Sequence, residues 1–208
     1  MEFQEYWDNS FESYQVDQKQ YSAWLDNYTD LFNNCETDVL DLGCGIGCDS
    51  IYLVEKGLKV IGCDFSKVAL ARLNKDCDKI KTICLDISKS LPFQDESFDI
   101  VLADLSLHYF DENTTKNILK EIRRILTNKG TLIARVNSML DFNHGAGQGE
   151  KIEENYYFVK GYKKRFFNKE EINKYFSVIG CVEAKEAHML RNENSKVVWE
   201  IVARKTQD

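Results

Sequence analysis

Three glycines at alternate positions, Gly43, Gly45 and Gly47, follow a short apolar run that contains one acid, Asp41. Glycine has no Cβ, so a turn of this composition lets the backbone pass close to a bound ligand. The run before the turn is typical of a central parallel strand, and helical spacing resumes directly after it over residues 49–56. A strand, a glycine turn and a helix in this order predict a nucleotide-type site at the carboxyl edge of a sheet.

The spacing of the glycines indicates which nucleotide is bound. A dinucleotide fingerprint has its third glycine three residues after the second, and this chain has Cys48 there. The turn instead resembles the first motif of class I S-adenosylmethionine-dependent methyltransferases, an acid two residues before Gly-x-Gly-x-Gly. Within that class the chain looks most like the small-molecule methyltransferases of the type 11/12 and tellurite-resistance groups, through this turn and residues 135–138 and 165–167. Glycine turns also serve plain strand-to-helix connections, so the interpretation depends on residues further along the chain.

Asp64 ends a second apolar run, residues 58–64, and Ser66 follows it as a predicted helix N-cap. In nucleotide-binding α/β folds, an acid at the tip of the second strand accepts hydrogen bonds from the ribose hydroxyls. The other interpretation of Asp64 is a helix-capping acid, a role that Ser66 already fills. We therefore expect Asp64 to bind the ribose.

A third apolar run, residues 80–87, also closes on an acid. The methyltransferase resemblance implies that Asp86 accepts a hydrogen bond from the adenine amino group and that Ile87 packs on the adenine ring. It also implies S-adenosylmethionine as the cofactor and no metal. The expected cofactor-binding residues are Asp41, Gly43, Cys44, Gly45, Gly47, Asp64, Phe65, Ser66, Asp86, Ile87, Asp104 and Leu105.

His108 and Tyr109 are the candidate catalytic residues, because they follow the fourth predicted strand, residues 98–103, at the edge of the expected site. Methyl transfer from a sulfonium needs a general base only where the nucleophile carries a proton at neutral pH. Histidine titrates in the range where a base is useful. A structural hydrogen bond at the corner between strand and helix explains His108 equally well. His144 and Glu150, in a later loop, are further candidates.

The elements that position these residues alternate between strand and helix. After the fourth strand, the pattern predicts a helix over about residues 111–128, closed by Gly130, and a fifth strand over residues 131–136. The connection between two further predicted strands, residues 181–187 and 196–204, is too short for a crossover, so they form an antiparallel hairpin. The predicted fold class is α/β: a Rossmann-like, seven-stranded, mostly parallel sheet with helices on both faces and a C-terminal antiparallel hairpin.

Two segments stand apart from this core, which we expect to span residues 35–208 of a single methyltransferase domain, 1–208. Residues 1–34 contain an apolar stripe at helical spacing over 21–32, and the resemblance implies a helical lid over the cofactor. The candidate lid residues are Tyr6, Trp7, Tyr14 and Tyr21. Residues 137–167 are predicted as a long substrate-side loop followed by a basic, partly buried aromatic strand.

Charge and cysteine content narrow the class of protein. The net charge of −7 argues against a protein that binds nucleic acid, because phosphate neutralisation needs a basic face. The chain opens without a signal-like or membrane-spanning run, so we expect a cytoplasmic monomer or homodimer whose seven cysteines are reduced. Cys44 and Cys48 have a spacing compatible with zinc, but zinc sites pair two such clusters.

These observations predict a methyltransferase that moves the sulfonium methyl group of S-adenosylmethionine to a small-molecule acceptor. Neither nucleic acid nor membrane is an expected partner. A non-catalytic S-adenosylmethionine-binding or sensor protein shares the same sheet and ribose acid, and so does a nicotinamide-dependent oxidoreductase, because the fold does not fix the function. The sequence leaves the atom that accepts the methyl group open.

Overall fold

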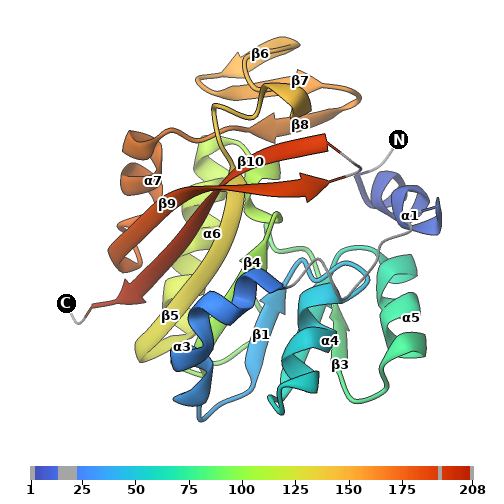
Figure 1. Cartoon of the computed structure of the whole chain (residues 1–208), viewed down its shortest axis with the longest axis vertical. Helices are drawn as coiled ribbons and strands as arrows, with labels where there is room; N and C mark the ends of the chain where they lie inside the picture. Colours follow the sequence, from blue (N-terminus) through green and yellow to red (C-terminus); the bar gives the residue numbers. More distant parts are fainter. Residues whose placement is uncertain (1–2, 14–22, 192–193, 207–208) are drawn as a thin grey trace.

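The computed structural model describes residues 3–13, 23–191 and 194–206, and Figure 1 labels its elements. Seven strands form the main sheet, in the order β3-β2-β1-β4-β5-β10-β9. They are β1 (Val39–Leu42), β2 (Val60–Asp64), β3 (Lys81–Cys84), β4 (Phe98–Asp104), β5 (Leu126–Asn137), β9 (Gly180–Arg191) and β10 (Asn194–Lys205). The first five are parallel, whereas β10 runs antiparallel to both β5 and β9. The predicted fold class is confirmed.

Helices cover both faces of this sheet (Figure 1). The α-helices are α1 (Phe3–Ser13), α3 (Thr29–Asn33), α4 (Cys48–Glu55), α5 (Lys67–Asp76), α6 (Glu112–Ile125) and α7 (Lys169–Phe176). Three 3₁₀ turns add to them: η1 (Ala23–Tyr28), η2 (Leu107–Tyr109) and η3 (Phe142–His144). Among the helices of the described residues, none is long and apolar enough to cross a membrane.

The hydrophobic core is divided by the sheet into two clusters. Because successive side chains of a strand point to opposite faces, β4 contributes to both clusters. Val101 and Ala103 pack with α6 and α7, whereas Ile100 and Leu102 pack with η1, α3 and α4. Burial on both faces explains why the central strands read as continuous apolar runs.

The end of α6 differs from the prediction. The helix ends at Ile125 rather than near residue 128, and the next residue, Leu126, already pairs with Phe98 in the sheet. Gly130 lies within β5, where a Cβ would be 2.9 Å from the Phe98 carbonyl oxygen. Its role is therefore close packing against β4, and burial of the Leu126 side chain ends the helix earlier than the periodicity indicated.

The stripe over residues 21–32 forms η1 followed by the short α3, not one continuous helix. Residues 14 and 21, two of the candidate lid positions, lie outside the described residues. A capping box begins α7: Asn168 accepts from the Glu171 N–H at 2.9 Å, and the Glu171 side chain accepts from the Asn168 N–H at 3.2 Å.

The region 137–167 contains more regular structure than the predicted loop and single strand. It holds η3 and a second, antiparallel sheet of three strands: β6 (Glu150–Glu153), β7 (Tyr156–Val159) and β8 (Tyr162–Arg165). Arg165 fixes this small sheet to the core, because its buried guanidinium donates to the Phe110 and Glu154 carbonyl oxygens and pairs with Glu153 at 2.5 Å. The small sheet lies beyond the carboxyl ends of the parallel strands in Figure 1.

Candidate functional site

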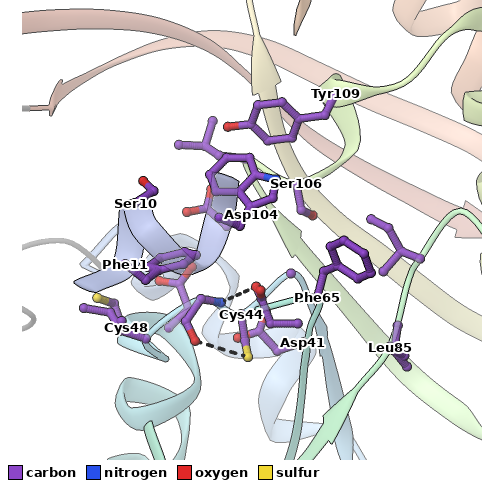
Figure 2. A pocket seen from close by; sticks show the side chains of 18 of the residues that line it. Ser10, Phe11, Asp41, Cys44, Cys48, Phe65, Leu85, Asp104, Ser106 and Tyr109 are labelled. Carbon is purple, nitrogen blue, oxygen red and sulfur yellow. Dashed lines mark hydrogen bonds between the residues drawn. The ribbon is translucent and has the colours of Figure 1, made fainter. Parts of the chain in front are cut away.

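A pocket opens at the carboxyl edge of the parallel strands, where the ends of β1 to β4 meet α1 and the end of β9. Figure 2 shows Phe11 of α1 on one side and Phe65 and Leu85 on the other, with Tyr109 beyond Asp104. The lining residues are Trp7, Ser10, Phe11, Asp41, Gly43, Cys44, Gly45, Ile46, Cys48, Asp49, Asp64, Phe65, Leu85, Asp86, Ile87, Asp104, Leu105, Ser106, Tyr109, Phe110 and Arg191. Most of the residues predicted for the cofactor are thus brought together, but Gly47 and Ser66 do not line the pocket.

The glycine turn is shaped by the protein around it. A Cβ on Gly43 would lie 2.4 Å from the Ser106 Cβ, and one on Gly47 would lie 2.2 Å from the Leu73 side chain. At these two positions a side chain would collide with other residues of the protein. All three glycines have a positive φ, and at Gly45 (φ +55°), in the pocket lining, a Cβ would lie 3.1 Å from the Phe11 ring, a looser contact than at the other two.

Asp64 holds this turn to the end of β2. Its two carboxylate oxygens accept from the Gly45 and Ser66 N–H groups, each at 2.8 Å. The side chain is buried, which raises the pKa of the carboxyl while the backbone N–H bonds act to lower it. Ser66 is the N-cap of α5, as predicted, and accepts from the Ala69 N–H at 3.1 Å.

Carboxylates crowd the floor of the pocket. Asp41 is 1% exposed, and burial, followed by the charge of Asp49, raises its pKa well above the usual value. Ser50 donates to Asp41 at 2.5 Å, and Trp24 donates to Asp49 at 3.3 Å. A positively charged ligand would favour the ionised form of these carboxyl groups, so the floor is suited to such a ligand.

Asp104, at the end of β4, has an arginine partner. Arg135 pairs with it through two bonds of 2.6 and 2.8 Å, and the guanidinium stacks over the Trp24 ring at 4.1 Å. This pair is almost fully buried. Such a bidentate pair fixes the carboxylate in one orientation at the pocket edge.

Aromatic side chains of α1 form the opposite wall. The Trp7 ring meets the Tyr109 ring edge-on with centroids 4.9 Å apart, and the Tyr6 and Tyr162 rings are 5.2 Å apart. A hydrogen bond also holds α1 to the core: the Ser66 hydroxyl donates to the Asp8 carboxylate at 2.5 Å. Two of the predicted lid residues, Tyr6 and Trp7, are thus placed beside the pocket or in its lining.

The two candidate catalytic residues have different positions. Tyr109 lines the pocket, but His108 does not, and it is 2% exposed. The Nδ1 atom of His108 has no hydrogen-bond partner among the described residues. Burial first, and then the charges of Lys196, Lys164 and Arg191, lower the pKa of His108 well below the usual value. The strand-end position predicted His108 at the site edge; the 3₁₀ turn directs this side chain into the interior instead.

Several lining residues were not predicted. Asp49 follows the glycine turn directly, so its position at the start of α4 was a usable signal. Arg191 ends a strand far away in the sequence, and only the hairpin brings it to the pocket. His144 bonds to Asp141 at 2.8 Å, and neither His144 nor Glu150 lines the pocket.

The cysteines show no sign of paired or reactive chemistry. All seven cysteines are free. Burial raises the pKa of Cys44 well above the usual value for a thiol, and it raises the pKa of Cys48 to about 12. Cys44 and Cys48 therefore carry protonated thiols at neutral pH. In the part of the chain that the structure describes, no group of three His, Cys, Asp or Glu side chains could hold a metal ion.

Residues 39–130 match the methyltransferase domain family, and they contain the glycine turn and the carboxylates of the pocket. These residues form a methyltransferase domain, which covers less than half of the chain. The match supports the S-adenosylmethionine-dependent methyltransferase family and the cofactor that the sequence indicated. A crystal structure of a methyltransferase from Methanosarcina mazei has a similar fold, with a TM-score of 0.70 and 22% identity over 87% of this chain and 99% of that one.

Two other similar proteins indicate the range of the family. An uncharacterized methyltransferase of Synechocystis is 33% identical over 88 residues, which are 42% of this chain and 41% of that protein. The chain therefore spans about two fifths of the length of that curated relative. A didemethyltoxoflavin N1-methyltransferase of Burkholderia thailandensis has a TM-score of 0.68 at 19% identity, over 96% of this chain and 82% of that one. Further relatives are a tRNA N(3)-methylcytidine methyltransferase of Drosophila melanogaster and a phosphoethanolamine N-methyltransferase of Arabidopsis thaliana.

Proposed function

We propose that this chain is an enzyme of one domain, residues 1–208, that transfers the methyl group of S-adenosylmethionine to a small-molecule acceptor. The observation that carries the proposal is the glycine turn held by Asp64 beside a floor of carboxylates. S-Adenosylmethionine bears a sulfonium and an ammonium group, so these carboxylates offset its positive charge. The pyrophosphate of a nicotinamide dinucleotide would be repelled by them, which disfavours the oxidoreductase alternative.

The lining residues fit the parts of this cofactor. We assign the ribose hydroxyls to Asp64, whose oxygens each retain a lone pair beside the backbone bonds they accept. The adenine is assigned to the side of the pocket formed by Phe65, Asp86 and Ile87. The remaining lining residues of the predicted set face the methionine portion: Asp41, Gly43, Cys44, Gly45, Asp104 and Leu105.

The bound cofactor supplies a methyl group that the sulfonium already activates, so the protein contributes mainly orientation. The Asp104 side chain paired with Arg135 and the glycine turn held by Asp64 give this part of the pocket a fixed shape. Helix α1 excludes water from the side of the pocket formed by Trp7. Tyr109 is the candidate catalytic residue that reaches the pocket. His108 would have to act through Tyr109, whose ring centroid lies 4.3 Å from its own.

A small acceptor is favoured by the enclosure of the pocket. Trp7, Phe11 and Tyr109 close one side of the pocket, and Arg191 is the one basic residue among the described residues of its lining, which favours a small acceptor over a nucleic-acid backbone. The net charge of −7 favours the same conclusion. Because one relative is named as a tRNA methyltransferase, tRNA is the competing acceptor, and methyl transfer to tRNA would contradict this part of the proposal.

Calorimetry with S-adenosylhomocysteine and with NADH tests the cofactor. We expect the first to bind and the second not to bind. Asp64→Ala should weaken S-adenosylhomocysteine binding about ten- to a hundredfold, because a hydrogen bond to a charged group contributes about 1.5–3 kcal/mol. Asp64→Asn, which keeps one acceptor for the Gly45 or Ser66 N–H, is the control for folding.

Unchanged affinity in a folded Asp64→Ala variant would remove this carboxylate from the cofactor site. S-Adenosylhomocysteine release in a screen of small acceptors would support the enzyme. Tight cofactor binding with no methyl transfer to any acceptor, tRNA included, would instead favour the sensor alternative.

A further inference from the structure

Charge is unevenly distributed around the pocket. Its five acidic lining residues come from β1, β2, β4, α4 and the end of β3: Asp41, Asp49, Asp64, Asp86 and Asp104. Among the described residues, Arg191 is the single basic side chain in the lining, and it comes from the end of β9. The pocket therefore has an acidic floor, in which Asp104 is paired with Arg135, and a basic group at the hairpin end.

Two buried lysines lie behind Arg191 and add to this positive end. Lys196 is 4% exposed and donates to Asp141 at 2.8 Å and to the Asn137 side chain at 2.6 Å. Lys164 is 6% exposed, and its ammonium lies 4.3 Å from the Tyr162 ring centroid and 3.4 Å from the His144 carbonyl oxygen. Lys196 thus has a carboxylate partner, whereas the Lys164 ammonium contacts an aromatic ring and a carbonyl oxygen, both neutral.

The cations at this end of the pocket are close enough to act on one another and on His108. Burial, followed by the charges of Lys196, Arg191 and Lys160, lowers the pKa of Lys164 to about 8, although Asp141 acts in the opposite direction. Burial first, and then the charges of Lys196, Lys164 and Arg191, lower the pKa of His108. His108 is therefore neutral at pH 7 and presents no opposing charge.

An apolar surface adjoins the positive end. Trp7 and Tyr109 are both lining residues, and their rings pack edge-on. The Tyr109 ring also lies 6.1 Å from that of Tyr162, the ring beneath the Lys164 ammonium. A ligand at this end of the pocket meets aromatic faces and a guanidinium together.

We propose that the methyl acceptor is a small organic anion whose carboxylate or phosphate group binds Arg191 and whose apolar body lies against Trp7 and Tyr109. Arginine presents two N–H groups in the geometry that matches such oxygens. Lys164 contributes through its charge, without direct contact. An anionic acceptor is also attracted to a cationic cofactor over the carboxylate floor, whereas an amine would be repelled by both the cofactor and Arg191. This inference rests on the proposed function.

Matched pairs of small molecules test the inference in the presence of saturating S-adenosylhomocysteine. Benzoate is compared with benzamide and phenyl phosphate with benzyl alcohol, and binding is measured by calorimetry. We expect one or both anions to bind more tightly than the neutral partner, and the two pairs show whether a carboxylate or a phosphate is preferred. Arg191→Gln should reduce the affinity for the anion about ten- to a hundredfold, and Lys164→Gln should reduce it about threefold.

Lys163→Gln is the matched control, because this exposed lysine lies next to Lys164 on β8. It should leave the affinity for the anion unchanged. Thermal melting checks that Arg191→Gln folds; if it does not, the comparison of Lys164→Gln with Lys163→Gln carries the test.

The outcomes separate this inference from the proposed function. If the parent protein does not bind S-adenosylhomocysteine, the proposed function itself fails. If S-adenosylhomocysteine binds but no anion does, or the neutral partners bind as tightly, the anion site is overturned and the proposed function stands. Equal binding of the anion by the parent and a folded Arg191→Gln variant would also overturn it.

Discussion

The floor of the pocket is built from short-range backbone contacts, whereas its opposite wall is built from side chains that are far apart in the sequence. On the floor, Asp64 accepts from the Gly45 and Ser66 N–H groups, and all three residues lie on one strand–helix–strand unit. In the wall, Trp7 of α1 meets Tyr109 of η2, and Arg191 comes from the last hairpin. A floor fixed by backbone geometry suits a constant cofactor, and a wall of separate side chains suits an acceptor that differs between relatives.

Gly45→Ala gives the largest expected effect, because it changes the place where floor and wall meet. The added Cβ would lie 3.1 Å from the Phe11 ring, in the space next to the proposed methionine portion of the cofactor. We expect S-adenosylhomocysteine affinity to fall about a hundredfold or more. The φ of +55° should cost about 1 kcal/mol of unfolding free energy, which thermal melting measures separately.

Gly57→Ala is the control for the backbone conformation. Gly57 has a φ of +92°, and a Cβ there would meet nothing within 4 Å. This variant should lose similar stability and bind the cofactor as the parent does. Full ligand-induced stabilisation of Gly45→Ala would contradict the placement of the cofactor beside the turn.

His108→Gln tests whether the wall contains a buried neutral histidine. The pKa of His108 is lowered in the folded protein, whereas the unfolded chain has a value near 6.5, so below that pH the unfolded state binds more protons. The parent should therefore lose up to about 2 kcal/mol of unfolding free energy between pH 7 and pH 5 through this residue. Denaturant unfolding of His108→Gln should show a correspondingly shallower dependence on pH.

His188→Gln serves as the matched control, since His188 is exposed on β9. Its pH dependence should follow that of the parent. An identical slope for the parent and His108→Gln would mean that His108 titrates normally, and it would return this residue to the candidates for a general base.

The smallest effect is expected in α1, where the wall closes over the floor. We propose that this helix is a lid, since Trp7, Ser10 and Phe11 line the pocket. Amide hydrogen exchange in residues 3–13 should slow by about five- to tenfold when S-adenosylhomocysteine is added. The distant α7 should not change. Equal exchange in α1 with and without ligand would make it an ordinary packing element.

The core fold was predictable because its signals are local. Strand periodicity, the Ser66 N-cap and the capping box of α7 each depend on residues within a few positions of one another, and all three are found in the structure. The short connection between the last two strands was enough to predict the antiparallel hairpin. The same locality placed Asp41 and Asp64 at the pocket, because parallel strands share one carboxyl edge.

Only the tertiary structure decided the wall and the ends of several elements. Leu126 joins β5 instead of continuing the helix because its side chain is buried in the core there. The free energy gained from this burial is not part of the local helix propensity. The three-stranded sheet depends on pairing between β6, β7 and β8, for which the loop composition gave no register. Arg191 and Trp7 meet at one pocket although 184 positions separate them, and no local pattern encodes such a contact. The sequence thus determined the floor that we assign to the cofactor through short-range backbone chemistry, while long-range packing decided which side chains form the wall that we assign to the acceptor.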